Sequence, residues 1–222
     1  MPAEVAPDGS PVEIYRRLPP SGEPELIHGA VSAGASILEL GCGAGRVTRG
    51  LVRLGHRVTA VDESAEMLSR VHGAELVQAW IEELDLGRTF DCVVLASHFV
   101  NQVDPEHRLR LLGACARHVS PGGSVLIESY PADLNWRAAV GKASVRGDVT
   151  ITVTEAAVDG PLVEAAVEYA VDGASWLQRF TARMLDLREL EAALREARLE
   201  FVRWLDAEQS WSESQPCENR GP

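Results

Sequence analysis

The chain has 222 residues, a formal net charge of −12 and 45% hydrophobic residues, which together predict a globular protein with one main core. An acidic chain lacks the clustered Lys and Arg that bind phosphate backbones, so nucleic acid is not expected as a partner. No apolar run reaches the roughly 20 residues of a membrane helix, and the N-terminus does not resemble a secretory signal. We therefore expect no membrane association and a cytoplasmic location.

The first 24 residues predict an N-terminal arm rather than a domain. They contain six of the twelve prolines and show no clear periodicity, apart from a short helical pattern near residues 12–18. The four cysteines of the chain lack the spacing of metal ligands, so no metal site is predicted.

Residues 25–130 predict a parallel sheet with crossover helices, because short apolar runs alternate with longer amphipathic stretches. The expected strands are ILEL (37–40), RVTAV (57–61), AELV (74–77), DCVVLA (91–96) and SVLIES (124–129). The expected helices are Arg46–Leu54, Ser64–Val71 and Pro105–His118, with Ser64 and Asp104 as N-caps. This pattern indicates a Rossmann-like core.

The pattern changes near residue 148 to the alternation of antiparallel strands. VTITVTEAAV, LVEAAVEYAV and SWLQRFTARML predict a three-stranded meander, so residues 131–185 are expected to form a lid or a homodimer surface. In the segment 186–222, we expect a helix over 186–197 and a strand at 199–205 that completes the core sheet. The polar tail from residue 206 is expected to fray.

The segment ILELGCGAGR (37–46) predicts a binding turn between a strand and a helix. Its glycines at 41, 43 and 45 allow a ligand to approach the backbone closely. Asp62 ends the next strand, where an acid can accept hydrogen bonds from ribose hydroxyls.

Two ligand classes suit such a turn, and two residues separate them. The third glycine of a dinucleotide fingerprint would fall at position 46, which is Arg46. Glu39 precedes the turn and would repel a pyrophosphate, but it suits a cation. S-adenosylmethionine (SAM), which carries a sulfonium and an ammonium, is therefore favoured as the cofactor over a nicotinamide dinucleotide.

ELGCGAGR (39–46) and VTAVDESAEML (58–68) resemble motif I and the following acidic strand end of class I SAM-dependent methyltransferases. The resemblance continues through FDCVVLASHFVN (90–101) and LLGACARHVSPGGSVLIES (111–129). After residue 130 the layout is more loosely similar to small-molecule methyltransferases that include the macrolide amino-sugar N-methyltransferases. The resemblance implies an α/β fold with a Rossmann-like, doubly wound seven-stranded sheet, to which the antiparallel meander is added.

The resemblance also implies a set of cofactor contacts. Gly41, Cys42 and Gly43 would line the methionyl part of SAM, with Glu39 near its amino group and Asp62 on the ribose. Where the family often has an Asp that binds adenine, this chain has Trp80, which either stacks on adenine or caps the strand end. Further implied contacts are Glu63, Met67, Ile81 and Ser97, of which Met67 has core packing as its alternative.

The acceptor should lie beyond the carboxyl ends of the strands, which selects SHFVNQ (97–102) and ESYPADLNW (128–136). His98 is the predicted catalytic base because its ordinary pKa is near neutrality, and its alternative is a polar residue satisfied at the loop entrance. The residues expected to orient the acceptor are Tyr15, Asn101, Glu128, Tyr130 and Trp136.

Three functions are consistent with these features. The favoured one is methyl transfer from SAM to a small-molecule acceptor. The second is a non-methylating reaction by a SAM-binding enzyme of the same fold. The third is a non-catalytic SAM-binding protein, which Trp80 and the polar tail would suit.

Overall fold

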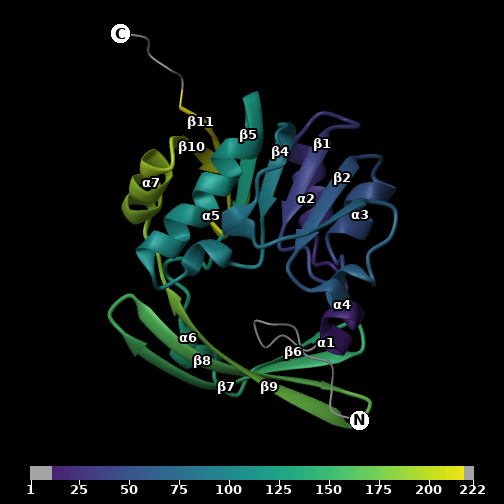
Figure 1. The fold of residues 1–222 in the computed structure, drawn as a ribbon. Helices are drawn as coiled ribbons and strands as arrows, with labels where there is room; N and C mark the ends of the chain where they lie inside the picture. Colours follow the sequence, from purple (N-terminus) through teal and green to yellow (C-terminus); the bar gives the residue numbers. More distant parts are fainter. Residues whose placement is uncertain (1–11, 218–222) are drawn as a thin grey trace.

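The computed structural model describes residues 12–217, so the predictions for residues 1–11 of the arm and 218–222 of the tail lie outside the described residues. Seven strands of this part form one sheet in the order β10-β11-β5-β4-β1-β2-β3 (Figure 1). The strands are β1 (Ser36–Leu40), β2 (Arg57–Asp62), β3 (Glu75–Gln78), β4 (Phe90–Leu95), β5 (Val119–Glu128), β10 (Leu199–Trp204) and β11 (Trp211–Pro216). The predicted doubly wound α/β core is confirmed.

The central strands are buried on both faces because successive side chains of a strand point to opposite sides. In β4, Val93 and Leu95 belong to the apolar cluster that packs with α5 (Pro105–His118) and α7 (Leu187–Glu196). Cys92 and Val94 belong to the opposite cluster, with α2 (Glu23–Ala30) and α3 (Thr48–Arg53). Continuous apolar runs in the sequence therefore correspond to strands covered by helices on both sides.

The two predicted N-caps, Ser64 and Asp104, are confirmed, whereas the helix expected from Arg46 begins at Thr48. The hydroxyl of Ser64 accepts a hydrogen bond from the backbone N–H of Met67 at the start of α4 (Ala65–Leu68). Asp104 accepts one from the backbone N–H of Glu106 at the start of α5. Short 3₁₀ turns, η1 (Ile81–Glu83) and η2 (Phe99–Asn101), follow β3 and β4.

A second, antiparallel sheet lies beside the core and has four strands instead of the three expected (Figure 1). Its strands are β6 (Ala143–Arg146), β7 (Val149–Asp159), β8 (Leu162–Val171) and β9 (Ala174–Arg183). The additional strand, β6, is a short edge strand whose residues are all exposed. It therefore has no buried face to produce the apolar alternation from which strands are predicted.

The expectation that the tail would fray is wrong for residues 211–216, because they form β11 between β10 and β5. Trp211 is buried in the core, and the small side chains of Ser212 and Ser214 are fully buried beside it. Glu213 accepts hydrogen bonds from Arg203 of β10 and from Ser124 of β5. A strand that is paired on both sides can thus consist mostly of polar residues.

Helix α1 (Val12–Arg17) lies between the second sheet and the glycine turn of the core, residues 41–45 (Figure 1). Val12 packs against Ala44 of the glycine turn, whereas Ile14 packs against Val149 and Val171 of the second sheet. Part of the predicted arm is therefore a bridge between the two sheets. None of the helices in residues 12–217 is long and apolar enough to cross a membrane.

Because β11 separates β10 from the rest of the sheet, Trp211→Ala should lower the free energy of unfolding by about 3–5 kcal/mol. Urea unfolding followed by circular dichroism measures this loss. Val202→Ala on neighbouring β10 is the control, since Val202 is 43% exposed and its truncation should cost less than about 1 kcal/mol. Equal losses in the two variants would contradict a core position for β11.

Candidate functional site

The glycine turn joins β1 to α3 in a conformation that requires glycine. Gly41, Gly43 and Gly45 all have positive φ, at 70°, 53° and 77°, which is the left-handed region that L side chains rarely adopt. A Cβ on Gly41 would lie 2.4 Å from Cε2 of Phe99, whereas a Cβ on Gly43 would have no atom within 4 Å. The turn is thus packed under Phe99 at Gly41 and open to a ligand at Gly43.

Asp62, at the end of β2, ties this turn to the following loop. Its Oδ2 accepts a hydrogen bond from the backbone N–H of Gly43 at 2.8 Å, and its Oδ1 accepts one from Ser64 at 3.0 Å. The structure therefore places the predicted ribose-binding acid directly beside the glycine turn. Cys42, the other residue of the predicted methionyl contact, is buried and donates its backbone N–H to the carbonyl of Val61.

Glu39 is a buried carboxyl beneath the turn, with 2% of its surface exposed. The hydroxyl of Thr48 donates a hydrogen bond to it at 2.6 Å. Burial raises the pKa of Glu39 to about 7, although Thr48 and the charge of Arg46 act in the opposite direction. A cation near this carboxyl would favour its ionised form.

The loop after β3 presents a tryptophan to solvent. Trp80 is 51% exposed, while the next residue, Ile81, is buried, so the indole does not cap the core. Gln78 donates a hydrogen bond to the backbone carbonyl of Glu63, which ties this loop to the loop after β2. Met67 is buried against Val12, in the packing arrangement that was its alternative.

The loop after β4 is held in a strained conformation. Ser97 and His98 have φ values of 55° and 59°, and non-glycine residues in this region cluster at functional sites. Oε2 of Glu128, at the end of β5, accepts a hydrogen bond from the backbone N–H of Ser97 at 2.6 Å. Oε1 of Glu128 lies 4.0 Å from Nε2 of His98. The two predicted loops therefore meet, and Glu128 supports the strained pair.

The imidazole of His98 is neutral and has one ring nitrogen without a partner. Burial, together with the charges of Arg46 and Arg146, lowers the pKa of His98 to about 3. Nδ1 of His98 is buried and makes no hydrogen bond within residues 12–217. The ring stacks on Tyr130 with 3.8 Å between centroids. His98 is thus not the satisfied loop residue of the alternative interpretation.

Aromatic side chains continue from His98 toward the second sheet. Tyr130 meets Trp136 of α6 (Trp136–Ala139) edge to face at 5.0 Å, and Trp136 lies 5.8 Å from Phe180 of β9. Tyr15 of α1 donates a hydrogen bond from its hydroxyl to Gln178 of β9 at 3.3 Å. Three residues predicted to orient the acceptor thus come together between the two sheets.

Asn101 has a different position. It is buried, its Nδ2 donates to the carbonyl of Arg183 at 2.8 Å, and its Oδ1 accepts from the backbone N–H of Tyr130 at 3.0 Å. These two bonds join the loops after β4 and β5 to the end of β9. Asn101 therefore stabilises the loops of the site through these hydrogen bonds.

Sequence reasoning missed two charged residues at this site. Arg46 was considered only as an obstacle to a dinucleotide, but it forms an ion pair with buried Glu23, the first residue of α2. Arg146 of β6 is close enough to affect the pKa values of His98 and Glu128. The position of Arg46 directly after the glycine turn could have indicated a residue of the site, whereas nothing in the sequence marks Glu23 or Arg146.

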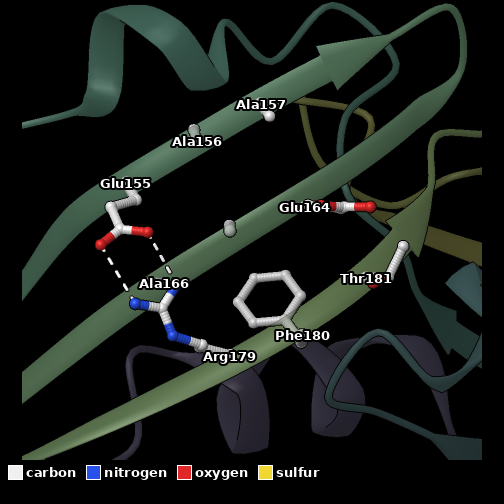
Figure 2. A pocket seen from close by; sticks show the side chains of 9 residues that line it. Glu155, Ala156, Ala157, Glu164, Ala166, Arg179, Phe180 and Thr181 are labelled. Carbon is white, nitrogen blue, oxygen red and sulfur yellow. Dashed lines mark hydrogen bonds and ion pairs between the residues drawn. The ribbon is translucent and has the colours of Figure 1, made fainter.

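A pocket of about 370 Å³ lies on the second sheet and is lined in part by Phe180, the last of the aromatic residues that continue from His98 (Figure 2). Glu155 and Arg179 pair across one side of it, next to Ala166 and the ring of Phe180. None of the residues predicted for the site lines this pocket.

Comparisons with known proteins agree with the geometry. Residues 37–123 match the family described as methyltransferase domain. The chain is 32% identical over 183 residues to the cypemycin N-terminal methyltransferase of a Streptomyces species, covering 76% of this chain and 74% of that protein. It is 35% identical over 108 residues to a ubiquinone biosynthesis O-methyltransferase of Xanthomonas oryzae pv. oryzae, covering 44% of each protein.

Among solved structures, a sugar N-methyltransferase from Streptoalloteichus sp ATCC 53650 superimposes with a TM-score of 0.71. It is 21% identical and covers 89% of this chain and 88% of that protein. At this identity the likeness shows a shared fold, which includes both the core sheet and the region after residue 130.

Gly41→Ala should destabilise the protein more than a matched glycine substitution, because it combines backbone strain with a collision against Phe99. Gly34 is the matched control, since its φ of 71° equals that of Gly41 within a degree and a Cβ there meets nothing within 4 Å. The strain alone should cost about 1–3 kcal/mol in both variants, and overpacking should add about 1–3 kcal/mol at Gly41.

Denaturant unfolding of both variants measures this difference. Replacing Phe99 by Leu in the Gly41→Ala background should recover part of the added loss. Equal losses in Gly41→Ala and Gly34→Ala would mean that Phe99 does not hold the turn.

Proposed function

Because this chain belongs to the class I SAM-dependent methyltransferases, we propose that it methylates a nitrogen atom of a small-molecule acceptor. The observation that carries the nitrogen assignment is the neutral His98 ring with its unpartnered Nδ1, beside the glycine turn. The name of the 32% identical relative, an N-terminal methyltransferase, supports the same atom.

The residues around the glycine turn fit SAM. Gly43 leaves open space for the methionyl part, and buried Glu39 suits its positive charges. We propose that Asp62 accepts hydrogen bonds from the ribose and that adenine stacks on the indole of Trp80, which is exposed. We propose the same cofactor-facing role for Gly41, Cys42, Glu63, Ile81 and Ser97.

SAM, when bound, supplies an electrophilic methyl group on its sulfonium. The protein then has to orient the acceptor and exclude water. A neutral amine becomes an ammonium on methylation and loses its proton to solvent after release. We assign orientation and water exclusion to Tyr15, Tyr130 and Trp136, since aromatic faces also attract the positive charge that develops on the amine during methyl transfer. His98 accepts a hydrogen bond from the N–H of the acceptor and directs the nitrogen lone pair.

The low pKa of His98 favours nitrogen over oxygen as the methylated atom. An alcohol becomes a good nucleophile only when a base removes its proton, and a group with a pKa of about 3 is a weak base for that purpose. A neutral amine already has a lone pair and needs only orientation. This site therefore suits an amine that arrives as the free base.

With nitrogen as the methylated atom, the pH dependence of kcat/KM should reflect deprotonation of the acceptor amine. With a pKa of about 3, His98 stays neutral between about pH 5 and 9, so kcat/KM should rise with pH until the amine is deprotonated. Its inflection should move with the pKa of each amine in a panel of amino sugars. His98→Asn should lower kcat by about 100-fold, the loss expected from misplacement of the reacting nitrogen, and leave the inflection in place.

Transfer of radioactive methyl groups from SAM to each amine measures these rates. The matching sugars with hydroxyl in place of the amino group are the control acceptors, and they should remain unmethylated. An inflection near pH 6–7 that disappears in His98→Asn would show instead that His98 titrates as the base. Methylation of the hydroxyl sugars alone would contradict the nitrogen assignment.

Cofactor binding should also depend on pH, through Glu39. Below its folded pKa of about 7 the carboxyl is protonated, and binding a cation must release that proton. The affinity for S-adenosylhomocysteine, which keeps the ammonium, should therefore increase from pH 6 to pH 8. Titration calorimetry in buffers of different ionisation enthalpy measures both the affinity and the released proton.

In Glu39→Gln the affinity should be lower and independent of pH over the same range. Glu25→Gln is the control, because Glu25 is an exposed acid on α2. A pH dependence that persists in Glu39→Gln would mean that another group is responsible for it.

A further inference from the structure

The methionyl part of SAM is a zwitterion, and the acids described above account only for its positive end. Glu39, Asp62 and Glu128 all lie at the carboxyl edge of the core sheet. A ligand carboxylate that enters among these acids requires a cation, because like charges disfavour one another at short range. The candidate cation must therefore lie at the same edge.

Arg46 lies at that edge. Its charge lowers the pKa of His98, and it acts against the rise in the pKa values of Glu39 and Glu128. Glu39 belongs to β1, Glu128 lies at the end of β5, and His98 lies in the loop after β4. Arg46 directly follows Gly45, the last glycine of the turn, and its guanidinium pairs with Glu23 at the start of α2. The side chain of Arg46 is 17% exposed, so part of it remains accessible to a ligand.

Glu23 holds Arg46 in this place. Burial would raise the pKa of Glu23, but the charge and hydrogen bond of Arg46 lower it overall. The position of Glu23 is fixed by close packing of α2 on α3, where a Cβ on Gly50 would lie 2.3 Å from Cγ of Pro24. The ion pair is therefore built into the contact between two helices of the core.

The guanidinium has hydrogen-bonding capacity to spare. Only its Nη1 donates to a group within residues 12–217, namely to Glu23. Arginine has five N–H donors in a planar fork that matches a carboxylate. The remaining donors can serve a second carboxylate while the bond to Glu23 persists.

We infer that Arg46 binds the α-carboxylate of the methionyl part of SAM, and that Glu23 is the positioning residue that holds the guanidinium for it. This inference rests on the assignment of SAM as the cofactor. It assigns the two charged groups of the methionyl part to two residues that flank the glycine turn. Glu39 lies on the side of the ammonium, and Arg46 binds the carboxylate.

The test uses a cofactor analogue that lacks only the carboxylate, decarboxylated SAM. In titration calorimetry, Arg46→Met should weaken the binding of SAM by about 10- to 100-fold, the loss expected for a charge-assisted hydrogen bond. Wild-type protein should bind decarboxylated SAM more weakly than SAM. Arg46→Met should leave the affinity for decarboxylated SAM unchanged, since the group that Arg46 binds is absent.

Two further variants keep the test decisive. Arg46→Met leaves Glu23 as a buried charge without its partner, so Glu23→Gln/Arg46→Met supplies a variant without that charge. It should show the same selective loss. Arg53→Met on the exposed face of α3 controls for the change in net charge and should leave both affinities unchanged.

An equal loss for SAM and decarboxylated SAM would overturn the inference, because Arg46 would then only shape the turn. Unchanged SAM binding in both Arg46 variants would overturn it as well. Failure of wild-type protein to bind SAM would overturn the cofactor assignment together with this inference, so the two failures are distinguishable.

Discussion

Hydrogen bonding between parallel strands brings the carboxyl ends of β1, β2, β4 and β5 to one edge of the sheet, and the site depends on this constraint. Residues far apart in the sequence lie at or just after the ends of three of these strands, namely Asp62, Ser97 and Glu128. Because β1 lies between β2 and β4, the glycine turn occupies the point where the strand order reverses. The bonds from Gly43 to Asp62 and from Ser97 to Glu128 then fix the loops relative to one another.

The electrostatic character of this edge follows from burial. Ionised carboxylates are costly away from water, and burial raises the pKa values of both Glu39 and Glu128. A cationic ligand relieves this cost, because it favours the ionised carboxyls. Binding of the cofactor and stability of the folded chain are therefore linked, since a ligand that binds only the folded state shifts the equilibrium toward it.

Periodicity was sufficient to predict the core, because strands such as β4 and helices such as α5 bury continuous apolar faces. It failed for β11, whose Ser212 and Ser214 are buried through backbone pairing on both sides rather than through hydrophobicity. It also failed for β6, an exposed edge strand. In both cases the strand depends on partners distant in sequence, which a local pattern does not contain.

The same reasoning explains which parts of the site were predicted. The glycine turn, Asp62 and the loops after β4 and β5 are marked by their places relative to predicted strands. The ion pair between Glu23 and Arg46 is not marked, because it requires α2 to pack on α3. Asn101 is a related case. Its position after β4 was predicted, but its hydrogen bond to β9 depends on the second sheet.

The second sheet also supports the proposed acceptor site directly. Asn101 bonds to the end of β9, and the aromatic contacts from His98 through Tyr130 and Trp136 end on Phe180 of the same strand. The strained conformation of His98 is thus supported from the core by Glu128 and from the second sheet by these contacts. A shift of β9 would therefore reach His98 through these contacts. It would also reach the glycine turn through α1, because Tyr15 bonds to Gln178 of β9 and Val12 packs against Ala44. The two proposed parts of the site are therefore linked through the second sheet.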